Sequence, residues 1–342
     1  MTEDSAPDGT VPDGGSVSSP FEVVSEVEET RSEKYEKLFD TYVRTPFEII
    51  WKDWRARFGF LILSVYVVTG IVGPHVVDEP RVVEGDVFVQ PFTNPQFPFG
   101  TDKMGRDIFA MVVHSTPQML IMMGSGAAAT VAIGTTVGAL AGYRGGWVDN
   151  ILSSITDIFI NIPGYPLIMV LSLMLPIEGD PAVIGVLISV MAWGGLSRKM
   201  RSQVLTLREE SFVEASRAIG QPSRLIVWKD ILPHLMPYAM INLASTARRI
   251  IFTAAGLYFL GILPYGDPNW GVMLNRAYSA GAFYRPEAMH WFLIPAFTII
   301  LIGTGLILLS QSLDRVFNPR VRARHEEHTE SSEVQPAEGG NL

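Results

Sequence analysis

The side chains that could do chemistry in this sequence of 342 residues are few, and their types exclude most catalytic mechanisms. Cysteine is absent, which rules out disulfides, thiolate metal sites, iron–sulfur clusters and a cysteine nucleophile. The sequence also lacks the G-x-x-x-x-G-K-[ST] loop that cradles phosphates, a Ser-His-Asp pattern and the H-E-x-x-H zinc motif. We therefore expect a chain that is not an enzyme by itself and that binds no cofactor or metal.

The most basic stretch of the chain lies between residues 197 and 233. Its bases are Arg198, Lys199, Arg201, Arg208, Arg217, Arg224 and Lys229. Phe212, Ala215 and Ile219 recur at helical spacing, which predicts a short helix with these residues along one face. Periodicity alone is equally compatible with an amphipathic helix that anchors the loop at the lipid headgroups.

Gly220 is expected to end this helix, because glycine takes the positive φ of a helix C-terminus without steric cost. Pro222 favours the start of a second helix, and Pro233 marks the entry to the next apolar stretch. The pattern predicts two short helices hinged at Gly220. On the first of them Glu214 could accept hydrogen bonds or pair with a base of another protein, or it could be a solvated surface acid.

Arg248 and Arg249 lie inside an otherwise apolar stretch. A charge at membrane depth is costly and usually faces a water-filled cavity or a partner, so these arginines are candidates for a translocation path. The alternative is that the span begins after Arg249, which would leave both side chains near the cytoplasmic face.

Asp102, Arg106 and Asp107 surround Gly105, and the simplest interpretation is an internally paired turn. Contact with an external binding protein is the alternative. His114 and His290 are predicted near membrane ends, and their spacing supports no metal site.

Composition indicates that the chain lies in a membrane. Apolar residues make up 48% and charged residues 18% of the sequence, and the mean hydropathy is +0.25. A membrane-crossing helix needs about 20 mostly apolar residues, because lipid offers its backbone no hydrogen bonds. The stretches that qualify are 58–77, 118–142, 155–175, 181–197, 237–262 and 291–311. We therefore predict an all-α integral membrane protein with six transmembrane helices.

The distribution of bases orients these spans. Lys52, Arg55 and Arg57 precede the first span, the most basic loop follows the fourth, and further arginines follow the last. The segment 78–116 is acidic instead. Since bases collect on the cytoplasmic side, we expect both termini in the cytoplasm.

The chain divides by composition into four parts. We predict a disordered acidic tail over 1–45, which holds much of the acid surplus behind the net charge of −9. The first span and an extracytoplasmic loop follow over 46–116, then the core transmembrane domain over 117–312, and a cytoplasmic tail over 313–342.

The order of residues in the basic loop resembles a known motif. Glu214-Ala215-Ser216, then Gly220, and Leu232-Pro233 further on resemble the EAA loop of ABC importer permeases, the coupling helix that docks on the ATPase. Ser216 replaces the usual alanine, and Asp230 stands where isoleucine is usual. Four further blocks in matching order resemble the C-type subunit of dipeptide/oligopeptide permeases: 99–107, 142–149 with Asp157 and Pro163, 259–261 with 268–271, and 313–320, where Asn318 replaces aspartate.

The resemblance implies the type I ABC importer permease fold with a cytoplasmic coupling helix in the loop 197–233. It implies a B-type permease as partner, two ABC ATPases that use ATP and Mg, and an extracytoplasmic solute-binding protein, in a prokaryotic cell membrane. The residues that it assigns to ATPase coupling are Glu214, Ala215, Ser216, Arg217, Gly220, Leu232 and Pro233. Arg217 and Arg224 could pair with acids of the ATPase or serve only to set the topology.

Alternatives remain at this point. The cargo of the permease group includes peptides, nickel chelates and sugars. A secondary transporter or channel without an ATPase would need intramembrane carboxylates for ion coupling, and the spans show almost none apart from Asp157. A membrane scaffold with a recruiting acidic tail is a further possibility.

Overall fold

The computed structural model describes residues 53–175, 179–264 and 268–317, all within one compact unit, Phe47–Leu342. Within these ranges the chain forms helices and loops and no strand, as predicted for an all-α protein. The predicted acidic tail over 1–45 lies outside the described residues, and so do residues 318–342 of the predicted C-terminal tail.

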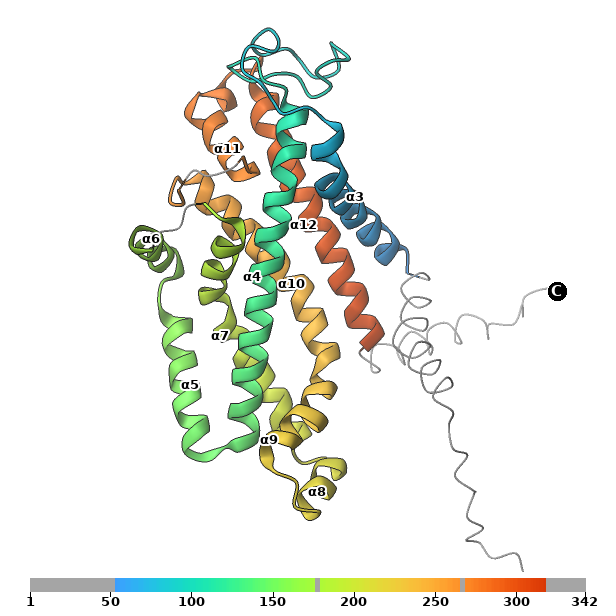
Figure 1. The fold of residues 1–342 in the computed structure, drawn as a ribbon, viewed down its shortest axis with the longest axis vertical. Coiled ribbons are helices and arrows are strands. Elements are labelled where there is room, and N and C mark those ends of the chain that lie inside the picture. Colours follow the sequence, from blue (N-terminus) through green and yellow to red (C-terminus); the bar gives the residue numbers. More distant parts are fainter. Residues whose placement is uncertain (1–52, 176–178, 265–267, 318–342) are drawn as a thin grey trace, which may run out of the picture. The chain divides into compact units, whose positions relative to one another are not determined.

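Figure 1 shows the helices in chain order. Their bounds are α3 Trp54–Val76, α4 Ile108–Arg144, α5 Gly146–Asn161, α6 Gly164–Met174, α7 Pro181–Leu207, α8 Ser211–Ala218, α9 Ser223–Ile226 with a π turn Val227–Ile231, α10 Leu232–Phe259, α11 Trp270–Ser279, a 3-10 turn Ala282–Tyr284, and α12 Met289–Phe317. The long helices α4, α7, α10 and α12 run side by side. Helices α8 and α9 lie at one end of them, and α11 with the loop 78–107 lies at the other.

Length and composition identify α3, α4, α7 and α12 as membrane spans, and the bent pair α5–α6 as a fifth candidate. The sequence predicted six. The remaining prediction, 237–262, falls in α10, which is 28 residues long and therefore long enough to cross. Arg248 and Arg249 lie within α10, which is not among the helices that length and composition select.

The directions of the helices nevertheless fit six passes. Gly126 and Gly138 of α4 approach Gly185 and Ser197 of α7 in the same order, so these two helices are parallel. The segment α5–α6 between them must therefore return across the same thickness. Contacts of Ile241 with Ser310 and of Phe252 with Gly303 make α10 and α12 antiparallel.

Three helices extend beyond the spans predicted for them. The second span was predicted from 118, but α4 begins at Ile108, because the Asp107 carboxylate caps it by accepting the Phe109 N–H at 2.9 Å. The fourth was predicted to end at 197, but α7 continues to Leu207, so the first part of the predicted loop is helix. The predicted division at 312 likewise falls inside α12.

The third span, predicted as one helix over 155–175, is bent by 91° between α5 and α6. Ile162 precedes Pro163 and has extended backbone angles, φ −66° and ψ 129°. The proline ring disfavours helical geometry at the residue before it, which places the break there.

The tightest packing joins α4 to α7 through small residues. Gly126, Gly134, Gly138 and Gly142 recur along one face of α4, a spacing that lets helix backbones approach closely in membranes. A Cβ atom at Gly138 would lie 2.4 Å from the Ser197 carbonyl oxygen, closer than van der Waals contact allows.

We predict that Gly138→Ala destabilises the chain by about 2 kcal/mol, because the added methyl group must push α4 away from α7. Thermal unfolding of the detergent-purified chain, followed by tryptophan fluorescence, measures the effect. Gly124→Ala is the matched control, since an added Cβ there has no atom within 4 Å. Equal unfolding midpoints for the two variants would contradict the proposed role of this contact.

Candidate functional site

The connection between α7 and α10, residues 208–231, forms the predicted pair of short helices. Helix α8 ends at Ala218, and Gly220 follows with φ +76°, the left-handed conformation that favours glycine. Its N–H donates to the Arg217 carbonyl at 2.9 Å. Pro222 then precedes α9, whose π turn leads directly into α10. The predicted hinge at Gly220 is therefore confirmed in its geometry.

The predicted apolar face of α8 does not pack as one surface. Val213 is the buried side chain of this helix, and it joins a cluster with Val204, Ile226 and Leu235. Ile219 is instead 74% exposed, and Ala215 is exposed as well. Phe212 is half-buried and stacks on His234 of α10, with ring centroids 4.5 Å apart. Because Val213 is the buried side chain of this two-turn helix, Ala215 and Ile219 are left facing outward.

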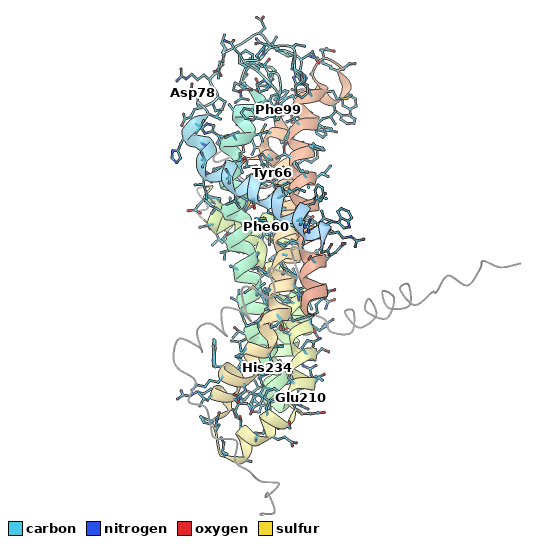
Figure 2. All side chains as sticks on the ribbon, turned by 90° about the vertical axis from the view of Figure 1, so that its right-hand side faces the viewer. Phe60, Tyr66, Asp78, Phe99, Glu210 and His234 are labelled. Atoms are coloured by element: carbon cyan, nitrogen blue, oxygen red, sulfur yellow. The ribbon has the colours of Figure 1, made fainter. Side chains whose placement is uncertain are left out.

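The residues predicted to couple to an ATPase lie at two places in this connection. Glu214 and Ala215 are exposed on α8, beside half-buried Ser216, whose carbonyl accepts the Gln221 N–H at 3.1 Å. Leu232 and Pro233 form the first turn of α10. The stack of Phe212 on His234 holds these two places together. Figure 2 labels Glu210 and His234 at this end of the molecule, opposite Asp78 and Phe99.

Arg217 faces the bundle rather than away from it. Its guanidinium carbon lies 5.2 Å from the ring centre of Tyr143, near the end of α4. This is the geometry of a cation–π contact, and it ties α8 to α4. Sequence reasoning identified Arg217 but not Tyr143 as its partner.

Two ion pairs that sequence reasoning missed hold α5 to α7. Arg201 donates from Nε and Nη2 to the two carboxylate oxygens of Asp149, at 2.6 and 2.5 Å. Arg198 pairs with Asp157 two turns further along α5. The two acids had been named as parts of a motif and the two bases as part of the basic stretch, but they were not paired with one another. The acids lie about 12 Å apart along α5 and the bases about 4.5 Å apart along α7, so their spacing gave no signal that would have paired them.

Arg248 and Arg249 lie deep within α10. They follow Leu232 by 16 and 17 residues, which at 1.5 Å per residue is about 24 Å along the helix. Arg248 is half-buried and Arg249 is exposed, and neither pairs with a carboxylate within residues 53–175, 179–264 and 268–317.

The loop before α4 contains the internally paired turn that the sequence predicted. The buried Asp102 carboxylate accepts the N–H groups of Met104 and Arg106 at 2.7 and 3.0 Å, and Arg106 Nε and Nη2 at 2.8 and 2.5 Å. Burial raises the pKa of Asp107 above its usual range. The hydrogen bonds that its carboxylate accepts from backbone N–H groups of α4 lower the pKa, but by less.

The two predicted interfacial histidines contact backbone. His114 Nε2 lies 2.8 Å from the Val77 carbonyl, and His290 Nε2 lies 3.0 Å from that of Thr101. No group of three potential metal ligands occurs in the part of the chain that the structure describes.

Residues 134–323 match the family described as binding-protein-dependent transport system inner membrane component. The match covers more than half of the chain, and the chain belongs to this family. It is a multi-pass inner-membrane permease of the ABC importer type.

Curated relatives extend the similarity over most of the sequence. The dipeptide transport system permease of Bacillus subtilis strain 168 is 29% identical over 295 residues, 82% of this chain and 87% of the relative. The oligopeptide transport system permease of Lactococcus lactis subsp. lactis strain IL1403 is 30% identical, covering 70% and 80%. The glutathione transport system permease of Pectobacterium atrosepticum is 26% identical, covering 83% and 94%.

We predict that Asp102→Asn lowers the stability of the chain by about 3 kcal/mol, because it leaves the Arg106 guanidinium without its buried anionic partner. The unfolding midpoint of the purified chain measures this. Lys103→Gln changes an exposed neighbour and should leave the midpoint unchanged. If both variants unfold at the temperature of the parent chain, the paired turn contributes nothing to stability.

Proposed function

We propose that the chain is one of the two permease halves of an ATP-driven peptide importer. The observation that carries this proposal is the family membership, together with relatives whose names specify dipeptide, oligopeptide and glutathione transport. These relatives are matched over four-fifths or more of their own length. Peptides are the substrate class that they have in common.

The partners follow from this assignment. A homologous B-type permease completes the translocation path, two ABC ATPases bind on the cytoplasmic side, and an extracytoplasmic solute-binding protein delivers the substrate. ATP and Mg belong to the ATPases, and this chain performs no catalysis and binds no cofactor. Both termini lie in the cytoplasm of a prokaryotic cell, as the bases around the spans favour.

The α7–α10 connection is the part that couples to the ATPase. Glu214, Ala215 and Ile219 form an exposed surface on α8 that combines a carboxylate with apolar groups. Val213 on the same helix is buried against α4, α7 and α10, so a force on α8 acts on the ends of three long helices. Closure of the ATPases on ATP must favour one permease state over the other, because only a difference in affinity shifts an equilibrium.

The second half of α10 lines the path. Arg249 and Phe252 are exposed there, one turn apart, and Phe252 also reaches Gly303 of α12. A guanidinium at this depth is stabilised by a water-filled cavity rather than by lipid. Arg249, with Arg248 beside it, is therefore placed to meet the carboxylate of a peptide.

The coupling assignment predicts that the full-length chain co-purifies with its ATPase and that Glu214→Ala combined with Gly220→Pro weakens this association at least about tenfold. Proline removes the Gly220 N–H and cannot adopt its positive φ, so the hinge is lost. Glu209→Ala, another exposed acid of the connection, is the control. Intact association and normal transport in the double variant would refute the assignment.

The path assignment predicts that Arg249→Gln lowers peptide uptake about tenfold while ATPase association is kept, and that Arg249→Lys restores part of it. Uptake of a labelled peptide into proteoliposomes that contain the whole transporter measures both variants. Arg285→Gln, an exposed arginine outside the spans, should transport normally. Normal uptake by Arg249→Gln would remove this residue from the path.

A further inference from the structure

A polar pocket of about 540 Å³ lies where the ends of α4 and α7 meet the hinge between α8 and α9. Arg144 comes from α4, Arg208 and Glu209 follow α7, Arg217 comes from α8, and Gln221 follows the hinge glycine. This end of the molecule carries the labels Glu210 and His234 in Figure 2. The pocket is distinct from the exposed surface of α8 that carries Glu214.

The charge of the pocket is unbalanced. Three guanidinium groups line it, against the single carboxylate of Glu209. That carboxylate is 77% exposed and lies 3.9 Å from Arg208, at the limit of an ion pair. Among the described residues, no carboxylate pairs with Arg144 or with Arg217.

The arginines also retain donors for a ligand. Arg208 uses Nη1 for the Gly142 carbonyl, at 3.3 Å, and Arg217 lies over the face of Tyr143. A guanidinium carries five N–H donors, so both keep several that neither contact uses. Gln221 lines the same pocket, and its buried Oε1 has no hydrogen-bond partner in the described structure. That oxygen requires a donor, which a hydroxyl group supplies.

We propose that this pocket binds a phosphate group that carries or adjoins a hydroxyl. A phosphate offers several anionic oxygens to guanidinium groups that converge from different elements, whereas a carboxylate is matched by one arginine. The phosphate comes from the headgroup of a glycerol-bearing anionic lipid or from free phosphate. A lipid source fits the neighbouring surface of α5, which is apolar. Trp147 there is 74% exposed, and Ile151 and Ile155 are exposed on the same helix.

A bound phosphate would add a connection between α8 and the ends of α4 and α7. It would link Arg144 at the end of α4 and Arg208 after α7 to Arg217 on α8, with Gln221 of the same pocket beyond the Gly220 hinge. The ligand therefore stabilises one position of α8 relative to the spans. The site does not depend on the identity of the cargo or of the ATPase.

The test measures phosphate binding to the full-length chain purified in neutral detergent. Inorganic phosphate is titrated and followed by calorimetry, and lipid retention is followed by native mass spectrometry after reconstitution with phosphatidylglycerol or with phosphatidylcholine alone. We expect Arg144→Gln and Arg208→Gln each to weaken binding at least about tenfold, the effect of losing one charged hydrogen bond. Arg224→Gln, an exposed arginine of α9 that does not line the pocket, should bind as the parent chain does.

Each outcome either tests the proposal or identifies the source of the phosphate. Saturable binding of inorganic phosphate that requires Arg144 and Arg208 supports a free phosphate, and selective retention of phosphatidylglycerol with the same requirement supports a lipid. The absence of both, or binding that the two substitutions leave unchanged, overturns the proposal. So does a chain that binds neither ligand but loses its ATPase on Arg144→Gln, because the pocket would then receive a protein carboxylate.

Discussion

The parallel contact between α4 and α7 is the constraint on which the rest of the fold depends. Two membrane helices of one chain can run parallel only if the segment between them returns across the membrane. Glycines of both helices make the contact close, since a Cβ at Gly185 of α7 would lie 2.2 Å from the Met122 carbonyl oxygen of α4. The same contact brings the ends of both helices together beneath α8, where Val204 and Tyr143 join Val213 in one apolar cluster. A motion of α8 therefore acts on both helices at once.

The returning segment is attached in a different way. Of the 16 residues in α5, Thr156 is the buried one, and the helix is held by the Asp149–Arg201 and Asp157–Arg198 pairs and by the contact of Phe159 with Trp193. Partly exposed ion pairs contribute little to stability compared with apolar burial. The bend at Pro163 further separates α5 from α6. This part of the chain is therefore attached less firmly than α4 and α7 are to each other.

The sequence predicted those features that one residue or one long apolar run determines by itself. Gly220 takes a positive φ because its neighbours end a helix there. The apolar runs locate the spans because a helix of about 20 apolar residues pairs its own backbone groups in lipid. The face of α8 could not be predicted. Eight residues carry too little periodicity, and the choice of Val213 over Ile219 is made by Val204, Ile226 and Leu235, which lie elsewhere in the chain. The break at Ile162 had a local signal in Pro163, which the continuous apolar run concealed.

The arginines of this chain illustrate how position changes the meaning of one residue type. Arg201 neutralises Asp149 and holds two helices together. Arg249 is exposed on α10, 17 residues beyond Leu232, and pairs with no carboxylate of the described residues. Arg217 belongs to the motif that resembles the coupling loop, yet its guanidinium faces Tyr143 and the pocket rather than the exposed side of α8. Glu214, Ala215 and Ile219 are the exposed groups of this short segment, and they are the ones that the proposal assigns to the ATPase, while Arg217 ties α8 to α4.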